Sequence, residues 1–193
     1  PRTRYAEVIL RDPTLPPDKQ YAGVYVLMEN IKRSKQRVDV PRIRTDASGQ
    51  TSGGYIVKID RVGGPETYFT SELGTVVGFV SPRGDRLEDD QRAWIRQDFS
   101  RLERTLASRD FRDPKHGYAA HFDVDSFVDY FLINELFKNV DAYFLSTFLH
   151  RDGEGKLRLG PVWDLDLSAG NASYGGAWHT EGWMLFPSDP RRA

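Results

Sequence analysis

Three aspartates flank a predicted β-hairpin in the second half of the chain. Asp141 stands at the end of an apolar run, and Asp164 and Asp166 follow the hairpin directly. The hairpin is indicated by two strand-like segments, 145–150 and 156–162, which enclose a turn signal of the Asp-Gly kind. A closed hairpin would bring the carboxylate at its entrance close to the two at its exit.

Carboxylates in this arrangement suit phosphoryl transfer. One carboxylate orients the attacking hydroxyl and accepts its proton, and a second holds the magnesium ion that bridges the phosphates. Protein kinases place the first in a catalytic loop and the second just past a short hairpin, which are the positions of Asp141 and Asp164 here. Kinases also carry a metal-binding Asn five residues after the catalytic Asp, where this chain has Ser146, a weaker oxygen ligand. Solvated acids on a surface hairpin would have the same spacing, so spacing alone leaves both interpretations open.

Lys58 and Glu29 are candidates for binding a nucleotide. Lys58 lies inside the predicted strand 55–62, and a kinase holds its phosphate-binding lysine on such a strand. The alternative is a lysine on an edge strand that points to water. Glu29 lies in the predicted strand 23–31 and is a candidate partner for that lysine, although an exposed Glu is the commoner outcome. The chain has no Gly-x-Gly-x-x-Gly, so any phosphate loop here differs from the ordinary kinase loop.

The predicted elements change in type along the chain. The first 80 residues predict a small antiparallel sheet, with strands at 5–10, 23–31 and 55–62 and weaker candidates at 68–69 and 76–80. A helix is then predicted from Asp89 or Asp90 to about residue 108. A second helix, 125–138, is apolar on almost every side, which predicts that it is buried.

A β-rich half followed by a helical half indicates an α+β fold. It is also the two-lobe order of kinases, with 1–80 as the β-rich lobe and 81–193 as the helical lobe that carries the hairpin. A length of 193 residues predicts one domain. The chain does not begin with methionine and shows no targeting signal, so we expect a fragment truncated at both ends.

Composition excludes several classes of protein. The net charge of −1 gives no general attraction to nucleic acid, and no apolar run is long enough to span a membrane. The absence of cysteine excludes disulfides and thiolate chemistry. The four histidines are not spaced as zinc ligands, which argues against a metal-dependent hydrolase.

Several segments of the chain resemble the CotH family, the atypical protein kinases associated with the bacterial spore coat. The resemblance covers roughly residues 20 to 185 and its blocks occur in the family's order. The segments that carry it are 23–29, 53–60, 139–141, 146–148, 155–157, 160–166 and 170–171. The Trp-Asp-x-Asp block at 163–166, with the Asn-x-Asp at 139–141 upstream of it, is fairly specific to the family.

The resemblance implies a protein serine kinase that transfers the γ-phosphoryl group of ATP, with Mg²⁺ or Mn²⁺, to a coat or surface protein. Asp141 would be catalytic, and Asp164, Asp166 and Ser146 would hold the metal. Lys58 and Glu29 would bind the nucleotide. The location implied is the spore coat or the cell surface. The alternative is an inactive kinase-like module in coat or envelope assembly, which Ser146 and the missing glycine-rich loop favour.

Overall fold

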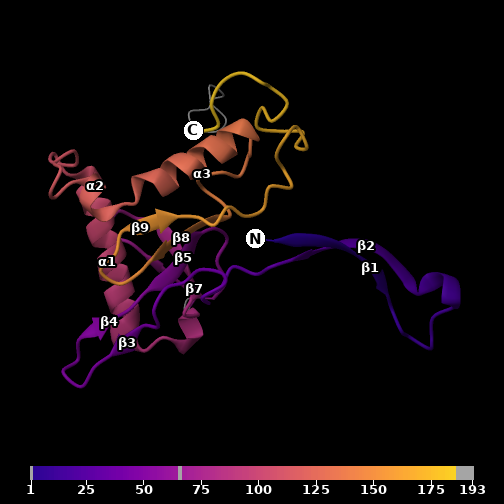
Figure 1. Cartoon of the computed structure of the whole chain (residues 1–193), viewed down its shortest axis with the longest axis horizontal. Helices are drawn as coiled ribbons and strands as arrows, with labels where there is room; N and C mark the ends of the chain where they lie inside the picture. The colour runs from indigo at the N-terminus through magenta and orange to yellow at the C-terminus, as the bar shows by residue number, and fades with distance from the viewer. Residues whose placement is uncertain (1, 65–66, 186–193) are drawn as a thin grey trace. The chain divides into compact units, whose positions relative to one another are not determined.

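The structure is a computed structural model that describes residues 2–64 and 67–185. The chain divides into two compact units, Pro1–Ile31 and Lys32–Ala193. The first unit is a hairpin of β1 (Thr3–Ile9) and β2 (Tyr21–Met28), which pair antiparallel (Figure 1). The short 3₁₀ turn Pro17–Lys19 lies in their connection. The strands predicted at 5–10 and 23–31 are confirmed, each beginning two residues earlier than expected.

A five-stranded antiparallel sheet forms the centre of the second unit, in the order β6-β7-β5-β8-β9. Its strands are β5 (Tyr55–Ile59), β6 (Tyr68–Thr70), β7 (Val76–Ser81), β8 (Thr147–Arg151) and β9 (Leu157–Leu159) (Figure 1). The expectation that the first 80 residues form one sheet is wrong, because β1 and β2 form a sheet of their own and β5 pairs with β8. Periodicity locates strands but does not choose their partners, and a buried strand such as β5 needs a neighbour on each edge.

The central position of β5 also decides how Lys58 is placed. Lys58 pairs with Gly78 of β7 on one side and with Phe148 of β8 on the other. It therefore does not lie on an edge strand. Because side chains alternate along a strand, Lys58 lies on the face opposite Val57.

The core lies between the Val57 face of the sheet and α1 (Asp89–Ala107). From α1, Ile95, Phe99 and Leu102 are buried, at the helical spacing that the sequence shows. They pack in one cluster with residues of the sheet: Tyr55, Val57, Phe69, Val77, Phe79, Leu149 and Leu157. The helix begins after a capping box of Glu88 and Gln91, one residue before the predicted cap.

The second long helix, α3 (Val124–Leu136), differs from the prediction in its burial. It follows the short helix α2 (Tyr118–His121) and lies beside β9 (Figure 1). Leu132 is 55% exposed and Leu136 is 78% exposed, whereas the polar Asn134 and Glu135 are buried. The expectation of a helix buried on all sides is therefore wrong, because hydrogen bonds rather than apolar contacts decide which side of its last turns faces inward.

The α+β class is confirmed, but the kinase-like two-lobe arrangement is not. The β8–β9 hairpin, expected in a separate helical lobe, extends the same sheet that contains β5, β6 and β7. Two further short strands, β3 (Arg44–Thr45) and β4 (Thr51–Ser52), pair with each other in a separate two-stranded sheet. In the described part of the chain, no helix has the length and apolar character needed to cross a membrane.

Candidate active site

The β8–β9 hairpin determines where Asp164 lies. Leu149 pairs with Leu159 in the antiparallel ladder, and the same register continued past the ladder sets residue 162 opposite Ser146. The amide of Gly160 donates to the carbonyl of Phe148 at 2.7 Å, which keeps the exit segment beside β8. The ring of Trp163 then packs edge-on against Phe148, with 6.3 Å between ring centroids. The segment after β9 therefore returns Asp164 to the start of β8.

Ser146 and Asp164 meet directly. The Oγ of Ser146 donates a hydrogen bond to Oδ2 of Asp164 at 3.2 Å. Both residues have left-handed backbone conformations, with φ of 49° at Ser146 and 62° at Asp164. Such conformations are costly for residues other than glycine and occur often at functional sites, where the surrounding structure maintains them. The two halves of the predicted hairpin site are thus brought together.

Asp141 and Asp166 act on Asp164 electrostatically. Partial burial, repulsion from Asp166 and repulsion from Asp141 raise the pKa of Asp164 above its ordinary value of 3.8, although the Ser146 hydrogen bond opposes the rise. The negative charges of Asp141 and Asp166 near Asp164 form a region that a cation would stabilise. Asp141 and Asp166 therefore lie near enough to Asp164 for their charges to act on it.

The donor set fits magnesium in the presence of phosphates. Within residues 2–64 and 67–185, no three His, Cys, Asp or Glu side chains are already arranged to hold a metal ion. Magnesium in phosphoryl-transfer sites takes one or two carboxylates and completes its shell with substrate phosphates and water. Asp164, Asp166 and the Ser146 hydroxyl supply oxygen ligands of that kind.

Lys58 joins the same group through Asp60. The Nζ of Lys58 lies 2.9 Å from Oδ2 of Asp60, and both side chains are largely buried. Burial alone would raise the pKa of Asp60, but hydrogen bonds from Lys58, Arg61 N–H and Ser146 N–H, together with the Lys58 charge, hold it below its ordinary value. Asp60 thus connects the lysine to the residue that contacts Asp164.

The loop that carries Asp141 is held by buried amides. The Nδ2 of Asn139 donates a hydrogen bond to Oδ1 of Asn134 at 2.8 Å. The Oδ1 of Asn139 accepts a hydrogen bond from the backbone N–H of Asp141 at 3.3 Å. Val140 and Ala142, on either side of Asp141, are buried. The α3 helix therefore fixes the backbone at Asp141 through Asn134.

Glu135 anchors the same loop from the other direction. Its buried carboxylate accepts from the hydroxyl of Tyr143 at 2.7 Å and from the amides of Met184 and Leu185 at 2.5 and 2.8 Å. Burial and the Glu135 carboxylate raise the pKa of Tyr143, so this hydroxyl stays protonated and donates. Glu135 thereby ties the Asp141 loop to the segment near residue 185.

Sequence reasoning missed Asp60, Asn134 and Glu135. Two signals in the sequence point to them. Asn134 and Glu135 are adjacent polar residues within an apolar helical run, where a polar side chain needs a partner if it is buried. Asp60 stands two residues after Lys58, so both side chains lie on the same face of the strand's path.

Glu29 has a partner within the first unit. Its Oε1 lies 2.6 Å from Nη2 of Arg2, which joins the end of β2 to the start of β1. The carboxylate partner of Lys58 is Asp60, so a role of Glu29 in nucleotide binding stays a prediction.

Comparison with known proteins yields a match to a family model. Neither a curated protein nor a solved structure matches the chain significantly. A family model described as "CotH kinase protein" matches residues 1–190, which is nearly the whole chain and includes every candidate site residue. The chain therefore belongs to the CotH kinase family.

Proposed function

We propose that this chain transfers the γ-phosphoryl group of ATP to a serine hydroxyl of a coat or surface protein, with Mg²⁺ or Mn²⁺ as cofactor. The observation that carries the proposal is the connected set of Lys58, Asp60, Ser146 and Asp164, with Asp141 acting electrostatically on Asp164. In this set Lys58 is a cation that can bind phosphate oxygens, Asp164 is a carboxylate that can bind a metal, and Asp141 is a carboxylate that can accept a proton. Family membership supports the same class of reaction.

Each residue has a separate task in this mechanism. Lys58 binds phosphate oxygens of ATP, and Asp60 orients its ammonium group. Asp164 and Asp166, with the Ser146 hydroxyl, hold the metal. Mg²⁺ bound there would neutralise charge on the phosphates and keep them in line for transfer. Asp141 accepts the proton of the attacking serine hydroxyl and directs its oxygen toward the phosphorus.

One observation favours an inactive assembly module as the second candidate. The residue that would complete the metal's ligands beside Asp164 is a serine, whose neutral hydroxyl donates to Asp164 and offers a metal only its oxygen lone pairs. A neutral hydroxyl is also a weaker ligand than the amide oxygen that kinases use at this position.

The test is phosphate transfer from labelled ATP to a serine-containing acceptor protein, with ATP binding measured in parallel. In Asp141→Asn we expect ATP binding to persist and transfer to fall about 10²–10⁴-fold, because only proton acceptance and orientation of the hydroxyl are lost. Asp129→Asn is the matched control, since Asp129 is exposed on α3. Transfer by Asp141→Asn at the parent rate would contradict the role of Asp141. A parent chain that neither binds ATP nor transfers phosphate would favour the assembly module.

A further inference from the structure

A second polar site lies at the opposite end of β5 and β8 from Asp164. A groove of about 740 Å³ adjoins Arg151, the last residue of β8, and Gly53, which precedes β5. This volume is within the range of ordinary ligand sites, roughly 300–1,000 Å³. The groove is lined by Pro41, Arg42, Arg44, Gln50, Thr51, Ser52, Gly53, Trp94, Asp98, Arg101, Arg151, Gly153 and Glu154.

The lining is positively charged although the chain as a whole is not. Four arginines and two acids give the groove a net charge of +2, against −1 for the whole chain. One face of α1 contributes Trp94, Asp98 and Arg101, at spacings of four and three residues. This concentration of arginine in a hollow favours an anionic ligand.

Asp98 neutralises only part of that charge. Its carboxylate lies 2.8 Å from Nη2 of Arg101 and 2.8 Å from Nη1 of Arg151, and it accepts from the hydroxyl of Tyr55 at 2.9 Å. Two guanidinium groups therefore share one carboxylate. Burial, together with the charges of Arg101 and Arg151, also lowers the pKa of the neighbouring His121, in keeping with a positive potential here.

Arg151 is the buried cation of this wall. Its side chain is only 6% exposed, and within the described part of the chain its solvent-inaccessible Nε has no hydrogen-bond partner. Arg151 therefore adds positive charge to the groove, whereas the exposed Arg42 and Arg44 can bind the oxyanions of a ligand directly.

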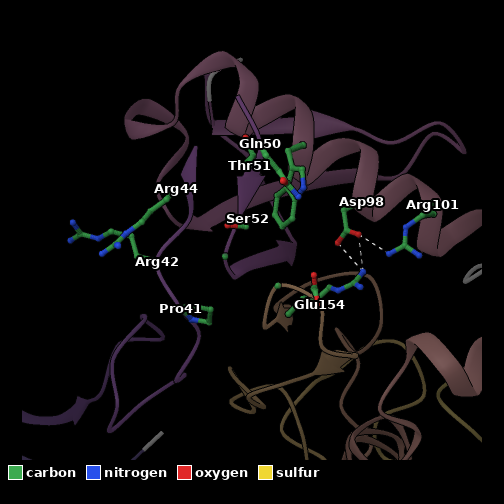
Figure 2. A pocket seen from close by; sticks show the side chains of 13 residues that line it. Pro41, Arg42, Arg44, Gln50, Thr51, Ser52, Asp98, Arg101 and Glu154 are labelled. Atoms are coloured by element: carbon green, nitrogen blue, oxygen red, sulfur yellow. Dashed lines mark hydrogen bonds and ion pairs between the residues drawn. The ribbon is translucent and has the colours of Figure 1, made fainter. Parts of the chain in front are cut away.

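The remaining arginines are set apart from this wall. Figure 2 shows Arg42 and Arg44 on one side of the groove and Asp98 with Arg101 on the other, with Ser52 and Glu154 between them. An extended chain with several anionic groups can contact arginines on both sides of the groove. Arginine pairs well with both carboxylate and phosphate groups because its planar fork donates two parallel hydrogen bonds.

We infer that this groove binds an extended peptide segment whose side chains carry carboxylate or phosphate groups. Trp94 would contact the apolar parts of the peptide, and the hydroxyls of Thr51 and Ser52 would bind its polar groups. The inference goes beyond phosphoryl transfer, because the groove lining contains none of the residues proposed for that reaction, which are Lys58, Asp60, Asp141, Ser146, Asp164 and Asp166.

The experiment measures anisotropy of short fluorescent peptides at low salt. One peptide carries spaced glutamates, a second carries phosphoserines at the same positions, and a third carries glutamines. We expect the first two to bind and the third to bind at least about tenfold more weakly, since each charge-assisted hydrogen bond supplies more free energy than a neutral one. Comparison of the affinities of the glutamate and phosphoserine peptides shows whether the groove prefers carboxylate or phosphate groups.

Substitutions locate the binding. Arg42→Gln/Arg44→Gln should weaken binding of the anionic peptides by about tenfold, because it removes two exposed cations from one side of the groove. Arg101→Gln should also weaken it and leaves Asp98 paired with Arg151. Arg109→Gln/Lys115→Gln is the matched control, since it removes the same charge from exposed positions outside the groove. Unchanged melting temperatures establish that the variants remain folded.

Three results would overturn the inference. They are an equal loss of peptide binding in the control variant, equal binding of the glutamine peptide, and no binding of either anionic peptide to the parent chain. Asp164→Asn should leave peptide binding unchanged. A chain that fails to bind ATP would count against the proposed kinase activity alone, because the peptide test does not depend on it.

Discussion

Replacing Asp164 with asparagine separates metal and nucleotide binding from folding. In the parent chain, Ser146 Oγ donates a hydrogen bond to Asp164 Oδ2 at 3.2 Å. Asparagine keeps the size of the side chain and retains an oxygen that can accept this hydrogen bond. It also tolerates the left-handed backbone at this position, where φ is 62°. The substitution therefore removes one negative charge and little else.

The expected stability without ligand follows from the pKa of Asp164. Partial burial and the repulsion of Asp166 and Asp141 raise that pKa above 3.8, so the folded chain favours the protonated acid. The acid's contribution to the free energy of unfolding is then fully present below pH 3.8 and is lost as pH rises through the folded-state pKa. Because the side chain is exposed, we expect Asp164→Asn to change stability at pH 7 by less than about 1 kcal/mol, in the stabilising direction.

The loss of ligand-dependent stability should be much larger. ATP with Mg²⁺ at a hundredfold excess over its dissociation constant stabilises a binding-competent protein by about 2.7 kcal/mol. For a chain of this length, 1 kcal/mol shifts the melting temperature by about 2–4 °C, so the parent should gain about 5–10 °C. Asp164→Asn should lose most of that gain, because the metal loses a charged ligand.

Thermal melting with and without ATP and Mg²⁺ checks both expectations. The control is ATP with a chelator, which should give the parent the same small shift as the variant. A variant that keeps the full ligand-induced shift would refute the assignment of Asp164 to the metal. A variant destabilised by several degrees without ligand would refute the electrostatic reasoning at this site.

Three further substitutions test the surroundings of the site. Asp60→Asn removes the charge beside Lys58 Nζ, so we expect weaker ATP binding in a calorimetric titration, and unchanged affinity would contradict the orienting role of Asp60. Tyr143→Phe removes a hydrogen bond to the buried Glu135 carboxylate, so the free energy of unfolding in urea should fall by about 1.5–3 kcal/mol. Gly54→Ala would place a Cβ 2.7 Å from the backbone oxygen of Arg151 and should cost about 1–3 kcal/mol in the same assay, whereas Gly63→Ala, with room for a Cβ, should cost much less.

The sequence predicts the hairpin well because its signals are local. The Asp-Gly turn and the alternating residues around it indicate both strands, and β8 and β9 form with the turn between them. Antiparallel pairing then brings the segment that follows β9 back beside the start of β8. The approach of Asp164 to Ser146 was therefore predictable without any knowledge of the rest of the fold.

The remaining parts of the site depend on distant contacts that no local pattern records. The pairing of β5 with β8 joins residues about ninety positions apart, and it brings Asp60 beside Ser146. The burial of Asn134 and Glu135 likewise depends on Asn139 and Tyr143, which lie beyond the helix. Helical periodicity weighs side chains by hydrophobicity, so it predicted a buried helix from the apolar residues and gave no indication that these two polar residues face inward.

Ser146 is the residue where these local and distant contacts meet. Its Oγ binds Asp164, and its backbone N–H helps to lower the pKa of Asp60 beside Lys58, so Ser146 lies between the cation and the acids of the candidate site. Its left-handed backbone would suit asparagine at least as well as serine. The side chain is only 7% exposed, however, so a larger amide would have to displace its neighbours. The serine at this position is therefore compatible with a site in which a small hydroxyl, rather than an amide, supports Asp164 as it binds a metal.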